Sequence, residues 1–127
     1  MNTLLATLTS ITASEHLSIL TASAGEDMFH LLLAEQCHEA IGTPLRLAFK
    51  ETEVILSKEF TTSTANIQSA AVEKIDKGIV LSQITLLYDE ITLTALVPTL
   101  TFNQLNIVEG DTISWMVQPS EISLIRG

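Results

Sequence analysis

Few residues of this 127-residue chain are of a type and spacing that could do chemistry. The single cysteine, Cys37, is followed by His38, and the other two histidines, His16 and His30, lie upstream. Thiolate and imidazole are ligands that zinc prefers, but a structural zinc site takes four of them at paired spacings. The scattered arrangement here forms no such motif. The sequence therefore predicts no protein-ligated metal ion, and it favours a buried, apolar role for Cys37.

Catalytic motifs are also missing from the sequence. It contains no nucleophile elbow, no glycine-rich phosphate loop and no paired spacing of histidine and carboxylate. Acidic residues gather at Gly25–Asp27 and at Asp89–Glu90, where they are typical of solvated hairpin turns. We therefore expect a protein that is not an enzyme.

The charge balance excludes one class of partner. The chain has 15 Asp and Glu against 6 Lys and Arg, which gives a formal net charge of −9. Nucleic-acid binding needs clustered basic residues, and none are clustered here. The lone cysteine excludes an intramolecular disulfide, so a reducing, cytoplasmic location is the default expectation. No stretch approaches the roughly 20 apolar residues of a membrane span, and the N-terminus lacks the basic start of a signal peptide.

Apolar and polar residues alternate along most of the chain, which is the period of a half-buried β-strand. The alternation is clear from Leu45 to Lys50, and Thr52–Leu56 continues it. Similar runs are Leu4–Ile11, Leu17–Thr21, Met28–Leu33, Ile79–Tyr88, Ile91–Val97 and Ile113–Val117. Two segments, Ala34–Ile41 and Leu100–Ile107, lack the alternation, and each predicts a short helix or helical turn. The expected fold class is all-β with short helical turns.

An internal repeat predicts the domain organisation. Asn2 aligns with Asn66 at an offset of 64 residues, whereas Gly42 aligns with Gly110 at an offset of 68, so the second copy carries four extra residues in its middle. A polar stretch separates the copies. We predict a first domain over residues 1–58, a linker over 59–65 and a second domain over 66–127. Copies of about 60 residues are too small for large sandwiches, and a five-stranded OB-like barrel is an economical way to remove strand edges.

The order of the motifs within each copy resembles the Mop, or TOBE, domain family. Leu47–Leu56 is similar to the closing signature of that domain, and Val108–Asp111 resembles its Glu-Gly-Asp turn. Thr62–Asn66 resembles the family's Ser-Ala-Arg-Asn opening. The resemblance covers nearly the whole chain as two tandem copies, as in molbindin-type proteins and the C-terminal half of the molybdate-responsive transcription regulator.

The resemblance implies a bound oxyanion, molybdate or tungstate, at the subunit interfaces of a homo-oligomer, either a trimer or a dimer. A tetrahedral dianion needs concentrated N–H and O–H donors and at least one cation. Lys50 stands where the family places its ligand lysine. The other candidate residues that the resemblance implies are Ser63, Thr64, Ala65, Asn66, Thr99, Thr101 and Gln118.

The chain departs from the family pattern at several of these places. Ala65 replaces the arginine of the opening, and Gln118 replaces the lysine of the second copy with a side chain that donates hydrogen bonds but brings no charge. Ala34 in the first copy and Pro98 in the second stand where the family has hydroxyl residues. Lys50 on its own is also compatible with a solvated edge lysine that blunts strand pairing.

Two functions stay open from the sequence. The first is cytoplasmic binding of molybdate or tungstate for storage, homeostasis or sensing. The alternative is an interaction and oligomerisation module whose anion sites are depleted and which acts with a transcription regulator or transporter.

Overall fold

The computed structural model describes residues 1–58 and 66–125, so the predicted linker and the last two residues lie outside the described part. The first repeat contains β1 (Asn2–Ala13), β2 (Ser18–Ala24), β3 (Asp27–Leu33), β4 (Pro44–Phe49), the 3₁₀ helix η1 (Glu51–Glu53) and β5 (Ile55–Ser57). The second contains β6 (Ile67–Lys77), β7 (Leu81–Tyr88), β8 (Ile91–Pro98), α1 (Thr99–Leu105), β9 (Thr112–Met116), the 3₁₀ helix η2 (Pro119–Glu121) and β10 (Ser123–Ile125). The predicted all-β class is confirmed.

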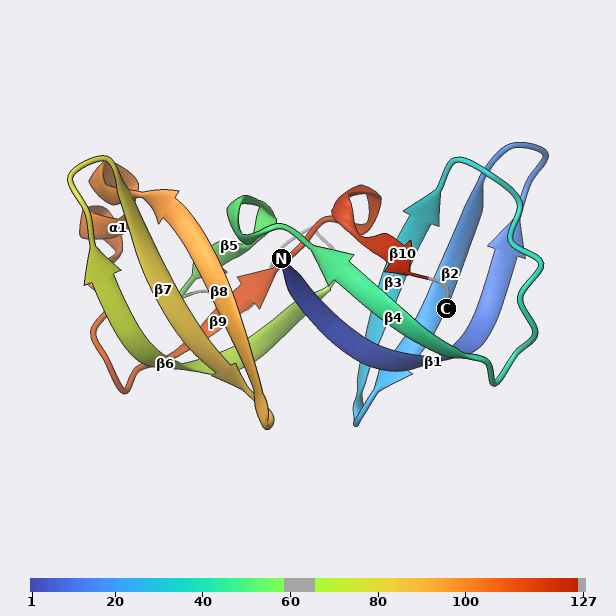
Figure 1. The fold of residues 1–127 in the computed structure, drawn as a ribbon, viewed down its shortest axis with the longest axis horizontal. Coiled ribbons are helices and arrows are strands. Elements are labelled where there is room, and N and C mark those ends of the chain that lie inside the picture. Colours follow the sequence, from blue (N-terminus) through green and yellow to red (C-terminus); the bar gives the residue numbers. More distant parts are fainter. Residues whose placement is uncertain (59–65, 126–127) are drawn as a thin grey trace.

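The strands form two curled, five-stranded antiparallel sheets that lie side by side (Figure 1). Their strand orders are β10-β4-β1-β2-β3 and β5-β9-β6-β7-β8. The two orders are equivalent, because each strand of one sheet has its counterpart from the other repeat at the same place in the other sheet. The molecule therefore has an approximate two-fold axis between its halves. Each sheet is a half-barrel, in agreement with the predicted OB-like architecture.

The last strand of each repeat belongs to the sheet of the other repeat. β5 pairs with β9, with Leu56 opposite Trp115, and β10 pairs with β4, with Leu124 opposite Leu47. The internal repeat predicts that the two halves have equivalent strands, but it does not predict this exchange. Because of it, the chain crosses between the two sheets immediately after β4 and again after β9, and η1 and η2 lie at these crossings (Figure 1).

Alternation of side chains explains why these segments are strands. Along β1 the burial alternates from Asn2 to Thr9, and along β7 it alternates over the whole strand. A bulge interrupts the β1–β2 pairing between Leu8 and Ser10, and the β6–β7 pairing is interrupted between Val72 and Lys74. The extra residue bends each long strand, which lets the sheet curl around its core.

Two predicted strand boundaries differ from the structure. The predicted continuation of strand through Thr52–Leu56 is wrong at its start, because η1 occupies Glu51–Glu53 and β5 begins only at Ile55. The strand predicted from Ile79 begins at Leu81. The turn preceding it leaves Ile79 almost fully exposed.

Of the two predicted helical segments, only the second is a helix. α1 covers Thr99–Leu105, whereas residues 34–41 contain no helix. In that segment Ser18 provides the hydrogen bonds, since its hydroxyl donates to the Glu35 carbonyl at 2.7 Å and accepts from the Cys37 N–H at 3.2 Å. The first repeat is four residues shorter here, so it spans the gap to β4 without a helical turn.

A cluster of four aromatic side chains joins the two halves into one core. The Trp115 ring stacks on Phe49 at a centroid distance of 5.7 Å and meets Phe29 at 5.9 Å and Tyr88 at 5.1 Å. Phe29 and Phe49 come from the first repeat, and the other two come from the second. Trp115 is fully buried, and its indole N–H finds no hydrogen-bond partner among the described residues. Its stabilising effect therefore comes from apolar and ring contacts.

Two asparagines tie the edge strand of each sheet to the other repeat. The Asn66 side chain accepts from the His30 N–H at 2.6 Å, and its amide donates to the carbonyls of His30 and Val117 at 2.8 and 3.1 Å. Asn2 makes the equivalent pair of bonds to the Thr94 backbone on β8, both at 2.8 Å. Each side chain thus replaces a missing strand neighbour at an edge.

We predict that Asn66→Ala lowers the free energy of unfolding by about 3 kcal/mol and Asn2→Ala by about 2 kcal/mol, since each lost bond contributes about 1 kcal/mol. Asn66 also has a φ of 64°, which alanine adopts at a cost. Urea unfolding measures both values. The control Asn103→Ala, on an exposed position of α1, is expected to change stability by less than about 0.5 kcal/mol. Equal stability of Asn66→Ala and this control would show that the asparagine bonds do not hold the edges.

We predict that Trp115→Phe costs less than about 1.5 kcal/mol, because it preserves an aromatic ring and removes an N–H without a partner. Trp115→Ala is expected to cost about 3–5 kcal/mol through the cavity it leaves. Circular dichroism has to follow the unfolding, since Trp115 is the only tryptophan. A phenylalanine variant as unstable as the alanine variant would contradict this account of the core.

Candidate functional site

Lys50 stands where β4 ends and η1 begins. Its backbone N–H donates a hydrogen bond of 2.8 Å to the Glu53 Oε1, which caps the first turn of η1. Lys50 is exposed, so its ammonium group is open to a ligand from solvent. The structure therefore places a cation at the crossing between the two sheets.

Two carboxyl groups share the surroundings of Lys50. Glu53 on η1 and Glu121 on η2 influence each other's ionisation, although they come from different repeats. The hydrogen bond from Glu121 holds the pKa of Glu53 below its ordinary value, and the positive charge of Lys50 lowers it further. The same hydrogen bond to Glu53 raises the pKa of Glu121.

An ion pair lies beside the first crossing. The N-terminal ammonium of Met1 contacts the Glu51 carboxylate on η1. Its hydrogen bond holds the pKa of Glu51 below the usual range.

Gln118 occupies the position equivalent to Lys50 at the second crossing. It precedes η2 and is exposed, and its carbonyl accepts the Glu121 N–H at 2.9 Å. Its amide can donate hydrogen bonds but carries no charge. The two crossings are therefore alike in backbone and unlike in electrostatics.

Of the predicted opening residues, only Asn66 lies in the described part. Ser63, Thr64 and Ala65 lie outside it. The Asn66 side chain is buried and engaged with His30 and Val117 as described above. The ligand role expected of Asn66 is that of its backbone N–H, and the structure adds a separate fold-stabilising role for its side chain.

The two predicted threonines on α1 differ in whether their hydroxyl groups are available to a ligand. The Thr99 hydroxyl is buried, donates to the Gly78 carbonyl at 2.9 Å and accepts from Ser82 at 2.8 Å. These bonds fix the start of α1 to the β6–β7 connection, so this hydroxyl is already used. Thr101 is exposed and lies at the edge of a pocket.

That pocket lies between the end of β8 and the segment from η1 to β5, and it has a volume of about 230 Å³. Thr52 and Thr101 provide its hydroxyls, while Phe102 and Leu105 of α1 provide apolar wall. Thr52 lies two residues after Lys50. The fold thus brings Thr101 to the same pocket as Thr52 of η1, the 3₁₀ helix that begins directly after Lys50.

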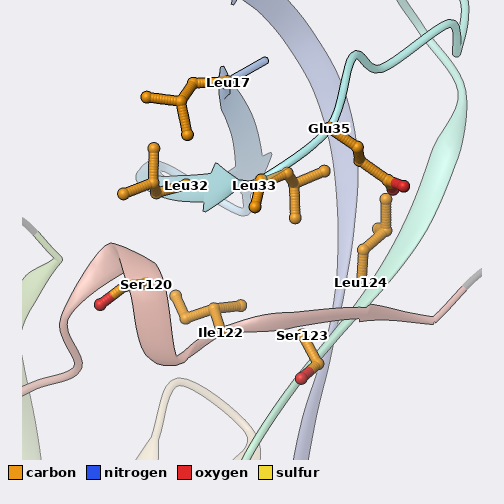
Figure 2. A pocket seen from close by; sticks show the side chains of 9 residues that line it. Leu17, Leu32, Leu33, Glu35, Ser120, Ile122, Ser123 and Leu124 are labelled. Atoms are coloured by element: carbon orange, nitrogen blue, oxygen red, sulfur yellow. The ribbon is translucent and has the colours of Figure 1, made fainter.

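The equivalent pocket of the other sheet is larger, at about 440 Å³, and lies between the end of β3 and the segment from η2 to β10. Figure 2 shows Leu32 and Leu33 facing Ile122 and Leu124 across it. No helix covers this pocket, because residues 34–41 are not helical. Its lining contains no basic residue and is mainly apolar. This pocket therefore lacks the cation that an anion site needs.

Two features of the site were not anticipated from the sequence, although a signal for both exists. Asn2 and Asn66 align at the offset of 64, and Glu53 and Glu121 align at 68. The identity of each pair is the signal, but the same alignment also pairs Ser18 with Ser82, whose hydroxyls bond within their own repeats. What the alignment does not contain is which residues of the other repeat each side chain meets.

The described residues contain no group of three or more His, Cys, Asp and Glu side chains placed to hold a metal ion. Cys37 is buried, and the His30 ring is hydrogen-bonded to the Thr21 hydroxyl at 2.9 Å. The described part of the chain has no helix of the length and apolarity that crossing a membrane takes.

Comparison with known proteins bears on the fold. No family model matches the chain, and no curated protein matches it. Among solved structures, the cytoplasmic molybdate-binding protein ModG, in a crystal form with molybdate bound, superimposes with a TM-score of 0.90. The match covers 97% of this chain and 94% of ModG at 19% sequence identity. The chain therefore has the tandem, OB-like Mop fold of this molybdate-binding protein, which confirms the resemblance at the level of fold.

Proposed function

We propose that the chain binds molybdate or tungstate in the cytoplasm, with storage, homeostasis or sensing of the oxyanion as its role. The observation that carries this proposal is the near-complete superposition on ModG, which is itself a cytoplasmic molybdate-binding protein. The proposal is one of binding rather than catalysis.

The first crossing supports the proposal by its chemistry. An oxyanion at Lys50 meets an exposed cation and, at the pocket beside it, the hydroxyls of Thr52 and Thr101. Charge-assisted hydrogen bonds to a lysine are stronger than neutral ones. We place the ligand at this crossing, with Lys50 as the counter-charge and with Ser63, Thr64 and the backbone N–H groups of Ala65 and Asn66 as further donors.

The same chemistry favours an assembled form. Lys50 and Thr101 are exposed and Thr99 is already engaged, so one chain offers few free donors. A dianion that loses its water needs several donors at once. We propose that a homo-oligomer, either a trimer or a dimer, supplies them at its interfaces, and that oxyanion binding stabilises the assembly.

The rival function rests on specific observations too. Gln118 lacks a charge, the larger pocket is apolar, and Glu53 and Glu121 lie beside the single lysine of the site. These features favour an interaction module whose anion sites are depleted and which acts with a transcription regulator or transporter.

Isothermal titration calorimetry with molybdate, tungstate and sulfate separates the two functions. We expect molybdate and tungstate to bind with similar affinity and sulfate to bind much more weakly. Light scattering before and after titration gives the number of chains per bound anion. A stable oligomer that gives no heat with any of the three anions would refute oxyanion binding and favour the interaction module.

Lys50→Ala is expected to weaken molybdate binding about tenfold or more, since a hydrogen bond to a charged group contributes about 1.5–3 kcal/mol. Gln118→Ala, the equivalent change at the second crossing, is the matched control and is expected to weaken binding less than about threefold. Both positions are exposed, so both variants should fold. Equal effects of the two substitutions would argue against Lys50 as the counter-charge.

A further inference from the structure

One corner of the second repeat carries exposed apolar side chains. Ile79 and Val80, in the turn between β6 and β7, are 99% and 75% exposed, and Leu100 on α1 is 78% exposed. The Thr99 N–H donates to the Val80 carbonyl at 2.9 Å, which holds the start of α1 against this turn. We call Ile79, Val80 and Leu100 the apolar tip. Contiguous apolar patches on a soluble protein mark interaction sites, whereas single exposed apolar residues do not.

The same corner of the first repeat is polar. Ser18 lies opposite Ala13 as Ser82 lies opposite Lys77, so the two corners correspond at the offset of 64 residues. The places of the apolar tip are taken there by three exposed polar residues, Glu15, His16 and Gln36. Since this corner folds with polar side chains in one repeat, the fold does not require the apolar ones in the other.

The first repeat has an open apolar pocket at the place that α1 covers in the second. In the second sheet, Phe102 and Leu105 of α1 form part of the pocket wall, and Phe102 is only 3% exposed. The first repeat has no helix at the equivalent place. Its pocket of about 440 Å³, with Leu17, Ile122 and Leu124 in the lining, therefore stays open to solvent (Figure 2). We call it the open pocket.

A chain does not bring its own apolar tip to its own open pocket. α1 and the turn between β6 and β7 lie at the outer end of one sheet, whereas β3 and β10, which border the pocket, belong to the other sheet (Figure 1). The exchanged strands and the shared aromatic core hold the two sheets in this arrangement. The occupant of the pocket must come from outside the chain, and a second copy carries a matching apolar tip.

The charges beside the two surfaces are complementary. Lys77 is exposed directly before the turn of the apolar tip, and its ammonium lies 6.0 Å from the centroid of the Phe102 ring on α1. Glu35 lines the open pocket beside Leu33 and Leu124 (Figure 2), and Glu15 lies in the turn that leads to β2. Two copies with a formal charge of −9 each repel one another, so a contact is favoured where a basic group of one meets acidic groups of the other.

We propose that the apolar tip of one chain docks into the open pocket of a second copy. Ile79 and Leu100 of the tip then take the place that Phe102 and Leu105 have in the second sheet. The contact uses two different surfaces and each chain carries one of each, so the contacts close into a ring of two or three chains. The inference rests on the homo-oligomer of the proposed function, and it does not depend on a bound anion.

The test is the oligomeric state of the whole chain, measured by light scattering and sedimentation over a range of concentrations, without and with molybdate. The tip variant combines Ile79→Glu with Leu100→Gln, which are the residues that the first repeat has at these places. We expect it to raise the dissociation constant of the oligomer at least about tenfold, as the loss of a central interface residue does. Ile41→Glu, the same change at an exposed loop position, is the matched control and should change the constant less than about threefold.

The pocket variant Ala34→Arg tests the other surface. Ala34 is exposed and lines the open pocket, so an arginine there blocks the pocket and repels Lys77 of a docking copy without disturbing the core. We expect the same loss of assembly as in the tip variant. Ala40→Arg, on an exposed residue outside the pocket lining, is its control. An equimolar mixture of the tip and pocket variants should form pairs of chains again, because each supplies the surface that the other lacks. Circular dichroism checks that all the variants fold.

The outcomes separate this inference from oxyanion binding. An oligomer with the same dissociation constant in the tip variant, or a loss of assembly in only one of the two variants, overturns the inference and leaves oxyanion binding standing. Loss of assembly in both variants and its return in the mixture, with no heat from molybdate, supports the inference and refutes oxyanion binding. A natural chain that stays monomeric at every concentration, without and with molybdate, overturns the inference and the proposed homo-oligomer together.

Discussion

The exchange of the final strands is the constraint on which the rest of the structure depends. β5 and β10 are only three residues long, and each completes the sheet of the other repeat. To reach that sheet the chain must turn within a few residues after β4 and β9, and a single turn of 3₁₀ helix is short enough to do so. Lys50, Glu53, Gln118 and Glu121 lie on these turns. The candidate site is therefore a product of the exchange rather than of either repeat alone.

The exchange also explains how two small sheets share one core. A unit of about 60 residues buries a modest fraction of its surface and is marginally stable by itself. Here the Trp115 ring packs on Phe29 and Phe49 of the other repeat, and the Asn2 and Asn66 side chains bind the opposite edge strands. Each repeat therefore contributes to the other a strand, part of the aromatic core and an asparagine side chain that forms hydrogen bonds with the exposed edge strand.

The sequence predicts local structure well because strand period and repetition are local signals. The alternation located most of the strands, and the two offsets located the inserted residues that become α1. The exchange could not be read in this way, because Val54–Leu56 and Ile122–Leu124 have nearly the same apolar pattern and fit either sheet. The helix predicted at residues 34–41 is wrong for a similar reason. The hydroxyl of Ser18, which is distant in sequence, makes hydrogen bonds to the backbone of this segment in place of helical ones. Of the candidate site, the sequence indicated Lys50 and Thr101 but not the carboxyls that come to lie beside the lysine.

The proposed binding of an anion by an acidic chain poses an electrostatic problem that the net charge of the chain cannot solve. With a formal charge of −9, the long-range field repels a dianion, although salt screens exposed charges beyond about 8 Å. Attraction must therefore be local, and the charged residues at the crossings decide it. Glu53 and Glu121 belong to different repeats and shift each other's pKa in opposite directions, so the charge on one depends on the charge on the other. This interaction joins the crossing that carries Lys50 to the crossing that carries Gln118 in the equivalent place, so the two crossings form one electrostatic unit.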